Sequence, residues 1–301
     1  MIVVVAGATG FIGAPLVAAL KSKGHEVRVL ARSPEKAKAA LGVTAAFPWS
    51  GAGGEPPLEA LAAADAVVNL AGESIAGGRW TAKRKALLRG SRIDATRNLV
   101  RAIGKATPRP RVLINGSAIG YYGDRPDGDL DENAAPGHDF LADLCREWEI
   151  AAQNVESLGV RLVTLRTGLV LGKNGGALDK MLLPFKLGAG GKLGSGAQWM
   201  SWVHLDDEIG LILHALENAD VRGPLNATAP APARNTEFTR ALGKVLGRPT
   251  ILPSPGFALK VALGEMSGML LTGQKVVPAK ALKTGYRFRY DTLDAALRAS
   301  V

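Results

Sequence analysis

The sequence predicts an α/β fold in which a doubly wound parallel sheet is joined to a smaller C-terminal α+β lobe. The chain opens with a short, apolar, β-branched run, Ile2–Ala6, which is typical of a strand buried on both faces. This run leads directly into the spaced glycines Gly7, Gly10 and Gly13. Short apolar runs then alternate with helix-compatible stretches as far as about residue 172, as expected for βαβ units with right-handed crossovers. Together these features indicate a Rossmann-type domain.

The glycine-spaced turn predicts a dinucleotide site. Glycines at this spacing allow a tight turn, close approach of the backbone to a pyrophosphate, and close packing of the next helix on the strand. Residues 14–23 are helix-compatible and Gly24 fits a helix stop. The helix N-terminus would direct free N–H groups and its positive dipole end at the phosphates. The cofactor contacts expected in this segment are Gly7, Thr9, Gly10, Phe11, Ile12 and Gly13.

The remaining elements follow from apolar runs and from glycine and proline punctuation. Strands are expected at residues 26–32, 66–71, 111–115, 161–166 and 199–204, and helices at 82–103, 140–158, 205–217 and 236–246. The tail is expected to form two helices and a short strand at 286–290. We therefore assign residues 1–172 and about 200–221 to the nucleotide-binding domain. Residues 173–199 and 222–301 form the smaller, substrate-type lobe, with 250–301 as its C-terminal helical module.

Composition argues against several classes of protein. The formal charge is +10, but lysines and arginines are scattered and aromatic residues are only 5% of the chain, so we expect no nucleic-acid partner. No apolar run approaches the roughly 20 residues that span a bilayer, and we expect neither a membrane partner nor a signal peptide. The four histidines are scattered, so no metal site is expected. The single cysteine, Cys145, suits a reducing compartment and predicts a cytoplasmic protein.

The end of the second strand predicts the choice of cofactor. The chain has Arg32 and Ser33 there, with no carboxylate before Glu35. An acidic residue would bind the ribose hydroxyls of NAD, whereas an arginine accommodates the 2′-phosphate of NADP. The alternative is an exposed arginine at a strand end. Given the glycine turn upstream, NADP is the expected cofactor, held by Arg32 and Ser33.

Several motifs together resemble the short-chain dehydrogenase/reductase superfamily, specifically its extended and atypical epimerase-like branch. They are the glycine turn, Asn69-Leu70-Ala71-Gly72, Ser117 with Tyr121-Tyr122-Gly123, residues 166–172 and residues 202–207. Residues 144–149, 223–230 and 273–278 are similar to a narrower sugar-epimerase-like family that carries a C-terminal domain of unknown function. The resemblance covers nearly the whole chain.

The resemblance implies further cofactor contacts. Leu70, Ala71 and Gly72 would flank the central part of an NADP molecule, and Glu73 would reach its ribose. The motif Arg166-Thr167-Gly168 places Arg166 and Gly168 among the expected cofactor-binding residues.

In the superfamily, a serine, a tyrosine and a lysine four residues after the tyrosine carry the chemistry. Counted back from Glu149, which matches the helix acid of the extended branch, the lysine position falls on Cys145 and the tyrosine position on Leu141. No Tyr-x-x-x-Lys occurs in the chain. A thiol cannot replace a fixed positive charge, and a leucine exchanges no proton.

Ser117, Tyr121 and Tyr122 are then the candidate catalytic residues, although Tyr122 would also suit a packing role. The expected partner is a small polar or anionic molecule, such as a nucleotide sugar, which Lys186, Lys192 and Arg222 would meet. Two functions stay open: an NADP-dependent epimerase or oxidoreductase, and an NADP-binding regulatory or interaction module that catalyses little. The oligomeric state is not predicted.

Overall fold

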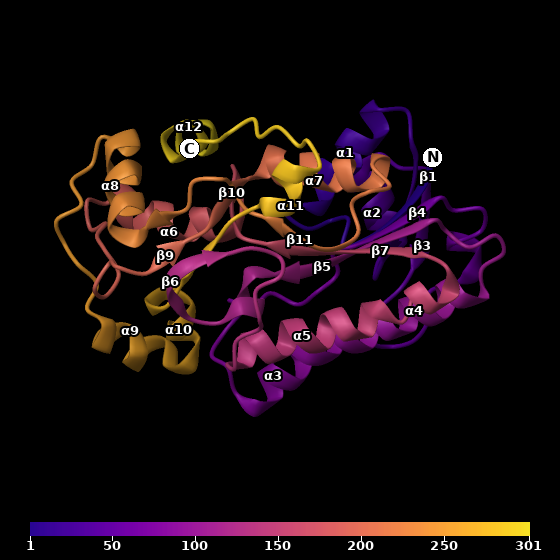
Figure 1. Ribbon diagram of the computed structural model, residues 1–301, viewed down its shortest axis with the longest axis horizontal. Coiled ribbons are helices and arrows are strands. Elements are labelled where there is room, and N and C mark those ends of the chain that lie inside the picture. Colours follow the sequence, from indigo (N-terminus) through magenta and orange to yellow (C-terminus); the bar gives the residue numbers. More distant parts are fainter.

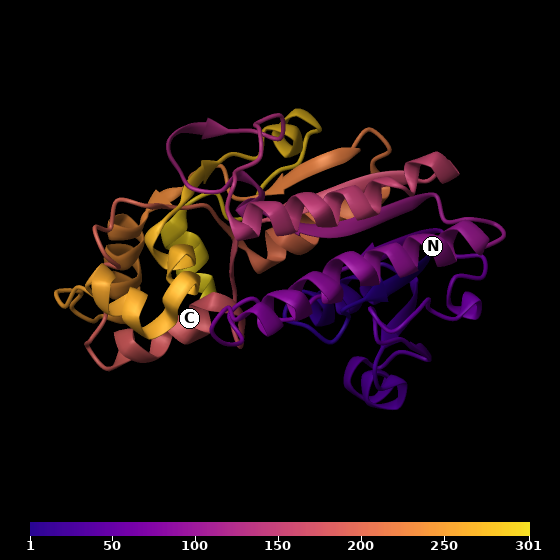
Figure 2. The ribbon, with the colours of Figure 1, turned by 90° about the horizontal axis from the view of Figure 1, so that it is seen from below.

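The computed structural model describes all of residues 1–301 and contains a seven-stranded parallel sheet with helices on both faces (Figures 1 and 2). Its strand order is β11-β7-β5-β4-β1-β2-β3. The strands are β1 (Ile2–Ala6), β2 (Glu26–Ala31), β3 (Ala45–Pro48), β4 (Ala66–Asn69), β5 (Val112–Ala118), β7 (Arg161–Thr167) and β11 (Gly223–Ala227). This is the predicted doubly wound α/β sheet.

The two faces of the sheet are covered by different helices. On one face lie α1 (Gly13–Ser22), α2 (Pro34–Leu41) and α7 (Leu205–Glu217), and on the other lie α4 (Ala95–Lys105) and α5 (Phe140–Gln153) (Figure 1). Val3 and Val5 pack toward the first face and Val4 toward the second, and none of the three is exposed. A strand buried on both faces needs such a continuous apolar run.

The sheet reverses its winding beside β1, because β2 follows on one side and β4 on the other. In open α/β sheets, ligands bind outside the carboxyl ends of the strands at this switch point. The glycine turn after β1 and residues 70–73 after β4 both lie there, and β1 and β4 pair in parallel as far as Ala6 and Asn69.

The second lobe has a core of its own, and Figure 1 shows it beyond the carboxyl edge of the sheet. Leu178, Phe185, Trp202, Phe238 and Leu297 are among its buried side chains. They come from α6 (Gly176–Lys186), β10 (Trp202–His204), α8 (Asn235–Leu246) and α12 (Leu293–Ser300). The other elements of this part are β8 (Leu169–Leu171), β9 (Trp199–Met200), β12 (Ala233–Arg234), α9 (Gly256–Leu263) and α10 (Gly268–Leu271).

A small parallel pair joins the C-terminal segment to the loop that follows β5. β6 (Arg125–Leu130) pairs with β13 (Gln274–Val276), and α11 (Ala279–Lys283) packs beside β11. The Gln274 side chain also donates to the carbonyl oxygen of Ile119 at 2.8 Å. The C-terminal segment therefore supports the loop that carries Tyr121 and Tyr122.

Three boundaries differ from the sequence expectation. Residues 223–227 were expected in the smaller lobe, but β11 extends the main sheet by parallel pairing with β7. Residues 286–290 form no strand, because the Arg289 and Tyr290 amides donate to the carboxylate of Asp207 at 2.7 and 2.9 Å. The helix expected at 82–103 is divided by a π-helical turn at 90–94 into α3 (Ala82–Arg89) and α4.

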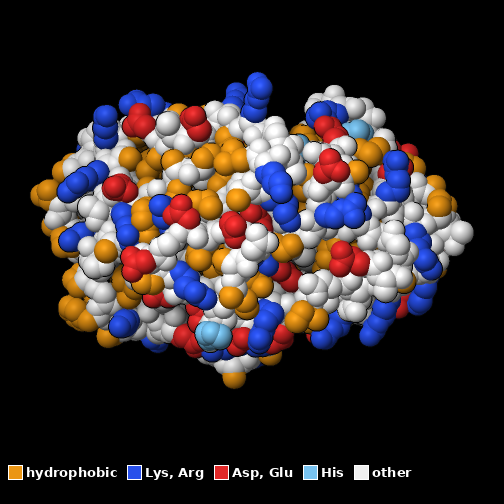
Figure 3. Space-filling view, viewed as in Figure 1, with side chains coloured by type: hydrophobic (Ala, Val, Ile, Leu, Met, Phe, Trp, Pro, Cys, Tyr) orange, Lys and Arg blue, Asp and Glu red, His pale blue; other side chains and the backbone are white.

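The tail and the strand expected at 199–204 also differ in detail. Residues 199–204 divide into β9 and β10, and residues 256–301 contain four α-helices rather than two. No helix is both long enough and apolar enough to cross a bilayer. On the face shown in Figure 3, lysines and arginines lie among acidic residues rather than in one patch.

Candidate cofactor and active site

Gly7 and Gly13 bring three backbone segments closer together than any side chain would allow. Gly7 has φ +76°, and a β-carbon on it would lie 2.6 Å from the carbonyl carbon and oxygen of Leu70. A β-carbon on Gly13 would lie 2.2 Å from the carbonyl oxygen of Gly7. Only glycine fits such contacts. The turn therefore holds β1, the start of α1 and the end of β4 together.

The N-terminus of α1 is free of internal partners. The backbone N–H groups of Phe11 and Ile12 make no hydrogen bond within the chain, and no side chain caps the helix. The first turn contains no acidic residue, and Thr9 and Gly10 are exposed. Free N–H groups and a positive dipole end suit an anion, so this segment fits the pyrophosphate of a dinucleotide.

The Phe11 ring covers the segment that leads into α6. A β-carbon on Gly175 or Gly176 would lie 2.7 Å from the ring, and one on Gly172 would lie 3.1 Å from it. Phe11 therefore links the glycine turn to the second lobe by packing. The sequence shows these glycines but not their partner, because about 160 residues separate them from Phe11.

Arg32 and Ser33 are exposed at the end of β2, and neither side chain makes a hydrogen bond within the chain. Ser33 is the N-cap of α2 but does not use its hydroxyl as a cap. The first carboxylate, that of Glu35, pairs with Lys38 at 2.9 Å. A free guanidinium, a free hydroxyl and a helix N-terminus suit a phosphate group.

Residues 70–73 follow the end of β4, beside the glycine turn. Leu70 and Ala71 are half-buried and Gly72 is exposed. The amide of Ala71 donates to the Asn69 side chain at 3.2 Å, which holds the segment in place. Glu73 was expected to reach a ribose, but Arg84 binds its carboxylate at 3.3 Å. This ion pair, which spans eleven residues, could not be read from the sequence.

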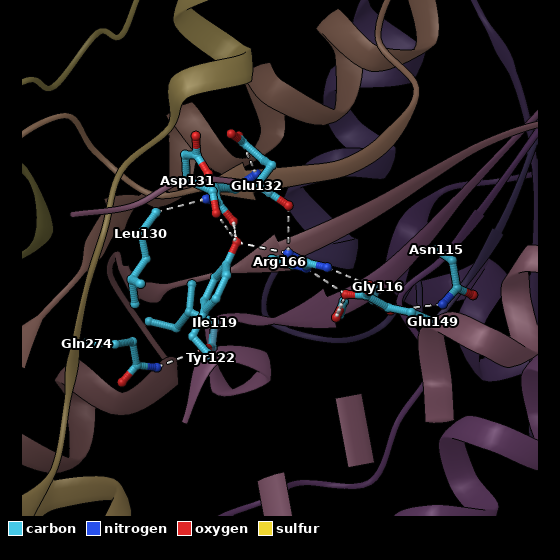
Figure 4. A network of polar contacts seen from close by, with 12 residues as sticks. Asn115, Gly116, Ile119, Tyr122, Leu130, Asp131, Glu132, Glu149, Arg166 and Gln274 are labelled. Carbon is cyan, nitrogen blue, oxygen red and sulfur yellow. Dashed lines mark hydrogen bonds and ion pairs between the residues drawn. The ribbon is translucent and has the colours of Figure 1, made fainter. Parts of the chain in front are cut away.

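Arg166 lies at the centre of a buried polar network (Figure 4). Its Nε and Nη2 donate to the two carboxylate oxygens of Glu149 at 2.8 and 2.9 Å, and its Nη1 donates to the Tyr122 hydroxyl at 2.9 Å. Burial disfavours the charged guanidinium, but Glu149 outweighs this effect and raises the pKa of Arg166 above its ordinary value. Arg166 was expected to bind cofactor. The residue is 2% exposed, and its side chain instead joins β7, α5 and the Tyr122 loop.

The same network restricts two of the three candidate catalytic residues. The Ser117 hydroxyl donates to Glu149 at 2.6 Å. Tyr122 is completely buried, donates to Asn226 at 2.7 Å, and has a pKa that burial raises to about 12. Tyr122 therefore has the packing role that its sequence context also allowed. Tyr121 is half-buried, its ring lies 3.5 Å from the Arg166 guanidinium carbon, and its hydroxyl makes no hydrogen bond within the chain.

Leu141 and Cys145 lie on α5 beside this loop. A β-carbon on Gly120 would lie 3.2 Å from Leu141 Cβ and 3.8 Å from Cys145 Sγ. Cys145 is 4% exposed, and burial, aided by the charge of Glu149, raises its thiol pKa to about 12. The thiol is therefore protonated near neutral pH and is a poor nucleophile. The side chains of Leu141 and Cys145 supply neither a phenol nor a cation.

Gly168 and Arg222 occupy different ends of the sheet. Gly168 follows β7, and a β-carbon on it would lie 2.5 Å from the carbonyl oxygen of Ser201, so packing requires glycine there. Arg222 precedes β11, at the amino edge of the sheet and opposite the glycine turn. Arg222 was expected to meet a substrate at the carboxyl edge, but at the amino edge it cannot do so. Lys186 and Lys192 are exposed on the second lobe.

One candidate functional residue, Glu208, was not predicted from the sequence. It lies in the first turn of α7, is completely buried, and accepts a hydrogen bond from Thr167 at 2.7 Å. Its second oxygen has no partner, and burial raises its pKa to about 8. The sequence predicts only that a helix begins at Asp206-Asp207-Glu208, and the tertiary contacts alone bury Glu208. No group of three or more His, Cys, Asp and Glu side chains is placed to hold a metal ion.

Comparison with known proteins agrees with this architecture. Residues 3–227 match the NAD dependent epimerase/dehydratase family, and residues 254–300 match a domain of unknown function (DUF1731). The chain is 45% identical over 302 residues to the epimerase family protein SDR39U1 homolog, chloroplastic, of Arabidopsis thaliana, covering 99% of this chain and 86% of that protein.

Solved structures extend the comparison. Human epimerase family protein SDR39U1 (isoform 2), crystallised with NADPH, superimposes with a TM-score of 0.90 and 38% identity, covering 99% of this chain and 98% of that one. UDP-glucuronic acid 4-epimerase from Bacillus cereus, solved in complex with NAD, shares the fold, with a TM-score of 0.79 and 19% identity over 100% of this chain and 95% of that one. The chain therefore belongs to the NAD dependent epimerase/dehydratase family and carries that family's short-chain-dehydrogenase-type domain together with a C-terminal DUF1731 domain.

Proposed function

We propose that this protein binds NADP(H) along the carboxyl edge of its sheet and acts as an epimerase or oxidoreductase on a small polar or anionic molecule. Nucleotide sugars are the first substrate class to test. The observation that carries the cofactor assignment is the pair Arg32 and Ser33, whose polar groups are uncommitted beside the free N-terminus of α2. The NADPH in the human relative's structure supports the same choice.

Bound NADPH would supply hydride transfer, and the chain would supply binding and proton movement. The glycine turn and the α1 N-terminus would hold the pyrophosphate. Among Ser117, Tyr121 and Tyr122, only Tyr121 has a polar atom free of internal hydrogen bonds, so Tyr121 is the proposed proton donor. The adjacent Arg166 guanidinium would stabilise negative charge on the phenol, although Glu149 neutralises part of its effect.

A second candidate function is supported by α5, which has Leu141 and Cys145 in place of a proton-transfer pair. Under this alternative the protein binds NADP(H) and catalyses little, serving as a cofactor-dependent regulatory or interaction module. For either function we propose the cytoplasm as the compartment, because Cys145 is a free thiol. We propose neither a nucleic acid nor a membrane as a partner.

A titration and a turnover screen distinguish these functions. Purified protein is titrated with NADPH and with NADH while cofactor fluorescence is followed, and is then incubated with NADPH and a panel of nucleotide sugars and carbonyl compounds. Tight NADPH binding with turnover on any member supports the enzyme. Binding without turnover across a broad panel supports the binding module, and absence of NADPH binding rejects both functions.

A further inference from the structure

The Arg92 guanidinium forms no ion pair with a carboxylate of the chain. It lies in the π-helical turn at 90–94 between α3 and α4. Three nearby arginines have acidic partners: Arg84 pairs with Glu73, Arg89 with Glu147, and Arg97 with Asp94. Arg92 makes only two long hydrogen bonds, both from Nη1 at 3.5 Å, to the Leu88 carbonyl and the Ser91 hydroxyl. Its Nε and Nη2 donate to no group of the chain.

The unpaired guanidinium lies beside Gly72, just after the end of β4. A β-carbon on Gly72 would lie 3.1 Å from its central carbon and 3.2 Å from Nη2. Its central carbon lies 5.2 Å from the centre of the Trp148 ring, a cation–π contact. The charge therefore lies beside Gly72, which directly follows Leu70 and Ala71. The backbone of Leu70 and Ala71 in turn contacts Gly7 of the glycine turn.

Holding a charge in this position is unfavourable without a ligand. Arg92 is half-buried, and burial lowers its pKa below the ordinary arginine value. A buried charge is normally paired, and an unpaired one costs free energy. A π-helical turn also costs regular hydrogen bonding and is frequent at functional sites. Both costs are offset if an anionic ligand binds beside Gly72.

Two other arginines of the candidate site are already paired with carboxylates. Arg166 is neutralised by Glu149, and Arg84 is held by Glu73. The face of α5 beside the Tyr121 loop has Leu141 and Cys145. Arg92 therefore supplies, from the turn between α3 and α4, a positive charge that the α5 face with Leu141 and Cys145 lacks.

We propose that Arg92 is a cofactor-positioning residue, whose guanidinium binds the phosphate and ribose of the nicotinamide half of the dinucleotide beside Gly72. This inference rests on the proposed NADP(H) binding and deepens it, because it assigns Arg32 to the adenosine half and Arg92 to the nicotinamide half. The two arginines then have separable effects on ligands that contain one half or both.

The test compares Arg92→Met with Arg89→Met and uses two ligands. Arg89→Met removes the same charge from the same stretch, three residues earlier, where the guanidinium pairs with Glu147. Binding of NADPH and of 2′,5′-ADP, which lacks the nicotinamide half, is measured by calorimetry. Arg92→Met is expected to weaken NADPH by about tenfold or more, the effect of losing a charge-assisted contact, and to leave 2′,5′-ADP within about twofold. Arg89→Met is expected to change neither ligand.

Arg92→Lys keeps the charge and is expected to recover part of the NADPH affinity. It replaces Arg92→Met as the test variant if Arg92→Met does not fold. NADPH affinity unchanged in both Arg92 variants would overturn the proposal. So would an equal loss of both ligands, because this would point to a general effect rather than a contact with one half. If the wild-type protein binds both 2′,5′-ADP and NADPH, and neither Arg92 variant binds them more weakly, only the role of Arg92 is rejected. A wild type that binds neither ligand rejects the proposed function itself.

Discussion

Glu149 on α5 and Arg166 on β7 form a bidentate ion pair in which both side chains are almost completely buried, with 6% and 3% of their side-chain surface exposed. The pair holds the helix against the sheet directly behind Ser117, at the end of β5, and the loop that carries Tyr121 and Tyr122. Ser117 donates to the same carboxylate and Tyr122 accepts from the same guanidinium. The position of the candidate catalytic loop therefore depends on this pair.

Removal of one partner should destabilise the fold strongly. Glu149→Ala leaves an uncompensated buried guanidinium, for which the expected cost is about 3–5 kcal/mol in the free energy of unfolding, measured by urea titration. The matched control is Asp143→Ala, which breaks an exposed pair with Arg146 on the same helix at 2.8 Å. That loss should be below about 1 kcal/mol. Equal losses of unfolding free energy in the two variants would show that the buried pair stabilises the fold no more than the exposed pair.

Gly7→Ala and Gly24→Ala should separate steric overlap from backbone strain. Both glycines have φ +76°, but only at Gly7 would an added β-carbon meet backbone atoms within 3 Å, and at Gly24 it would meet nothing within 4 Å. Gly24→Ala should cost about 1–2 kcal/mol, from strain alone. Gly7→Ala should cost at least about 2 kcal/mol more and should abolish NADPH binding. Thermal unfolding and NADPH fluorescence measure the two effects, and a Gly7→Ala protein with normal affinity would contradict the role of the turn.

Arg32→Ala should weaken NADPH by about 1–3 kcal/mol, because a charge-assisted contact to the 2′-phosphate is lost. NADH lacks that phosphate, so its affinity should not fall. Lys36→Ala, which removes a neighbouring exposed charge from α2, is the control for long-range electrostatics. If wild-type protein bound NADH as tightly as NADPH, the assignment of Arg32 to the phosphate would be wrong.

Glu208 should make the stability of the fold fall as pH rises. Burial raises its pKa from 4.5 to about 8, so the folded protein retains a proton that the unfolded chain releases. The contribution of the protonated Glu208 to the free energy of unfolding is fully present below pH 4.5. It is lost progressively toward pH 8, at up to about 1.4 kcal/mol per pH unit. Glu208→Gln cannot ionise. Its stability relative to wild type, measured by urea unfolding, should therefore rise between pH 5 and pH 8, and a constant difference would show that Glu208 does not titrate in this range.

Tyr121→Phe should abolish turnover on any substrate that the screen identifies and should leave NADPH affinity within about twofold, because the phenol has no partner whose loss would disturb the fold. Tyr122→Phe provides the contrast. It removes hydroxyl contacts to Asn226 and Arg166 and should lower stability by about 1–3 kcal/mol. Turnover retained in Tyr121→Phe would exclude this phenol as the proton donor.

The local pattern was enough to predict the doubly wound sheet and the glycine turn. Residues 2–13 contain a strand, a turn and the start of a helix, and the physical requirements for each lie within a few residues of one another. The strand expected at 286–290 was wrong because its amides bind Asp207, about 80 residues earlier in the chain. The assignment of 223–227 to the lobe was wrong because the edge of the β7 strand accepts β11 as a further strand.

The candidate site divides in the same way. The residue types at Arg32, Ser33 and the glycine turn carry their chemistry locally, so the sequence by itself determined the fold class and pointed to a dinucleotide. Only the tertiary structure decided that Arg166 is neutralised, that Tyr122 is buried, that Glu208 is desolvated and that Arg92 is left without a carboxylate. Charge pairing and burial depend on which distant segments meet, and those contacts arise only when the sheet and its helices pack together.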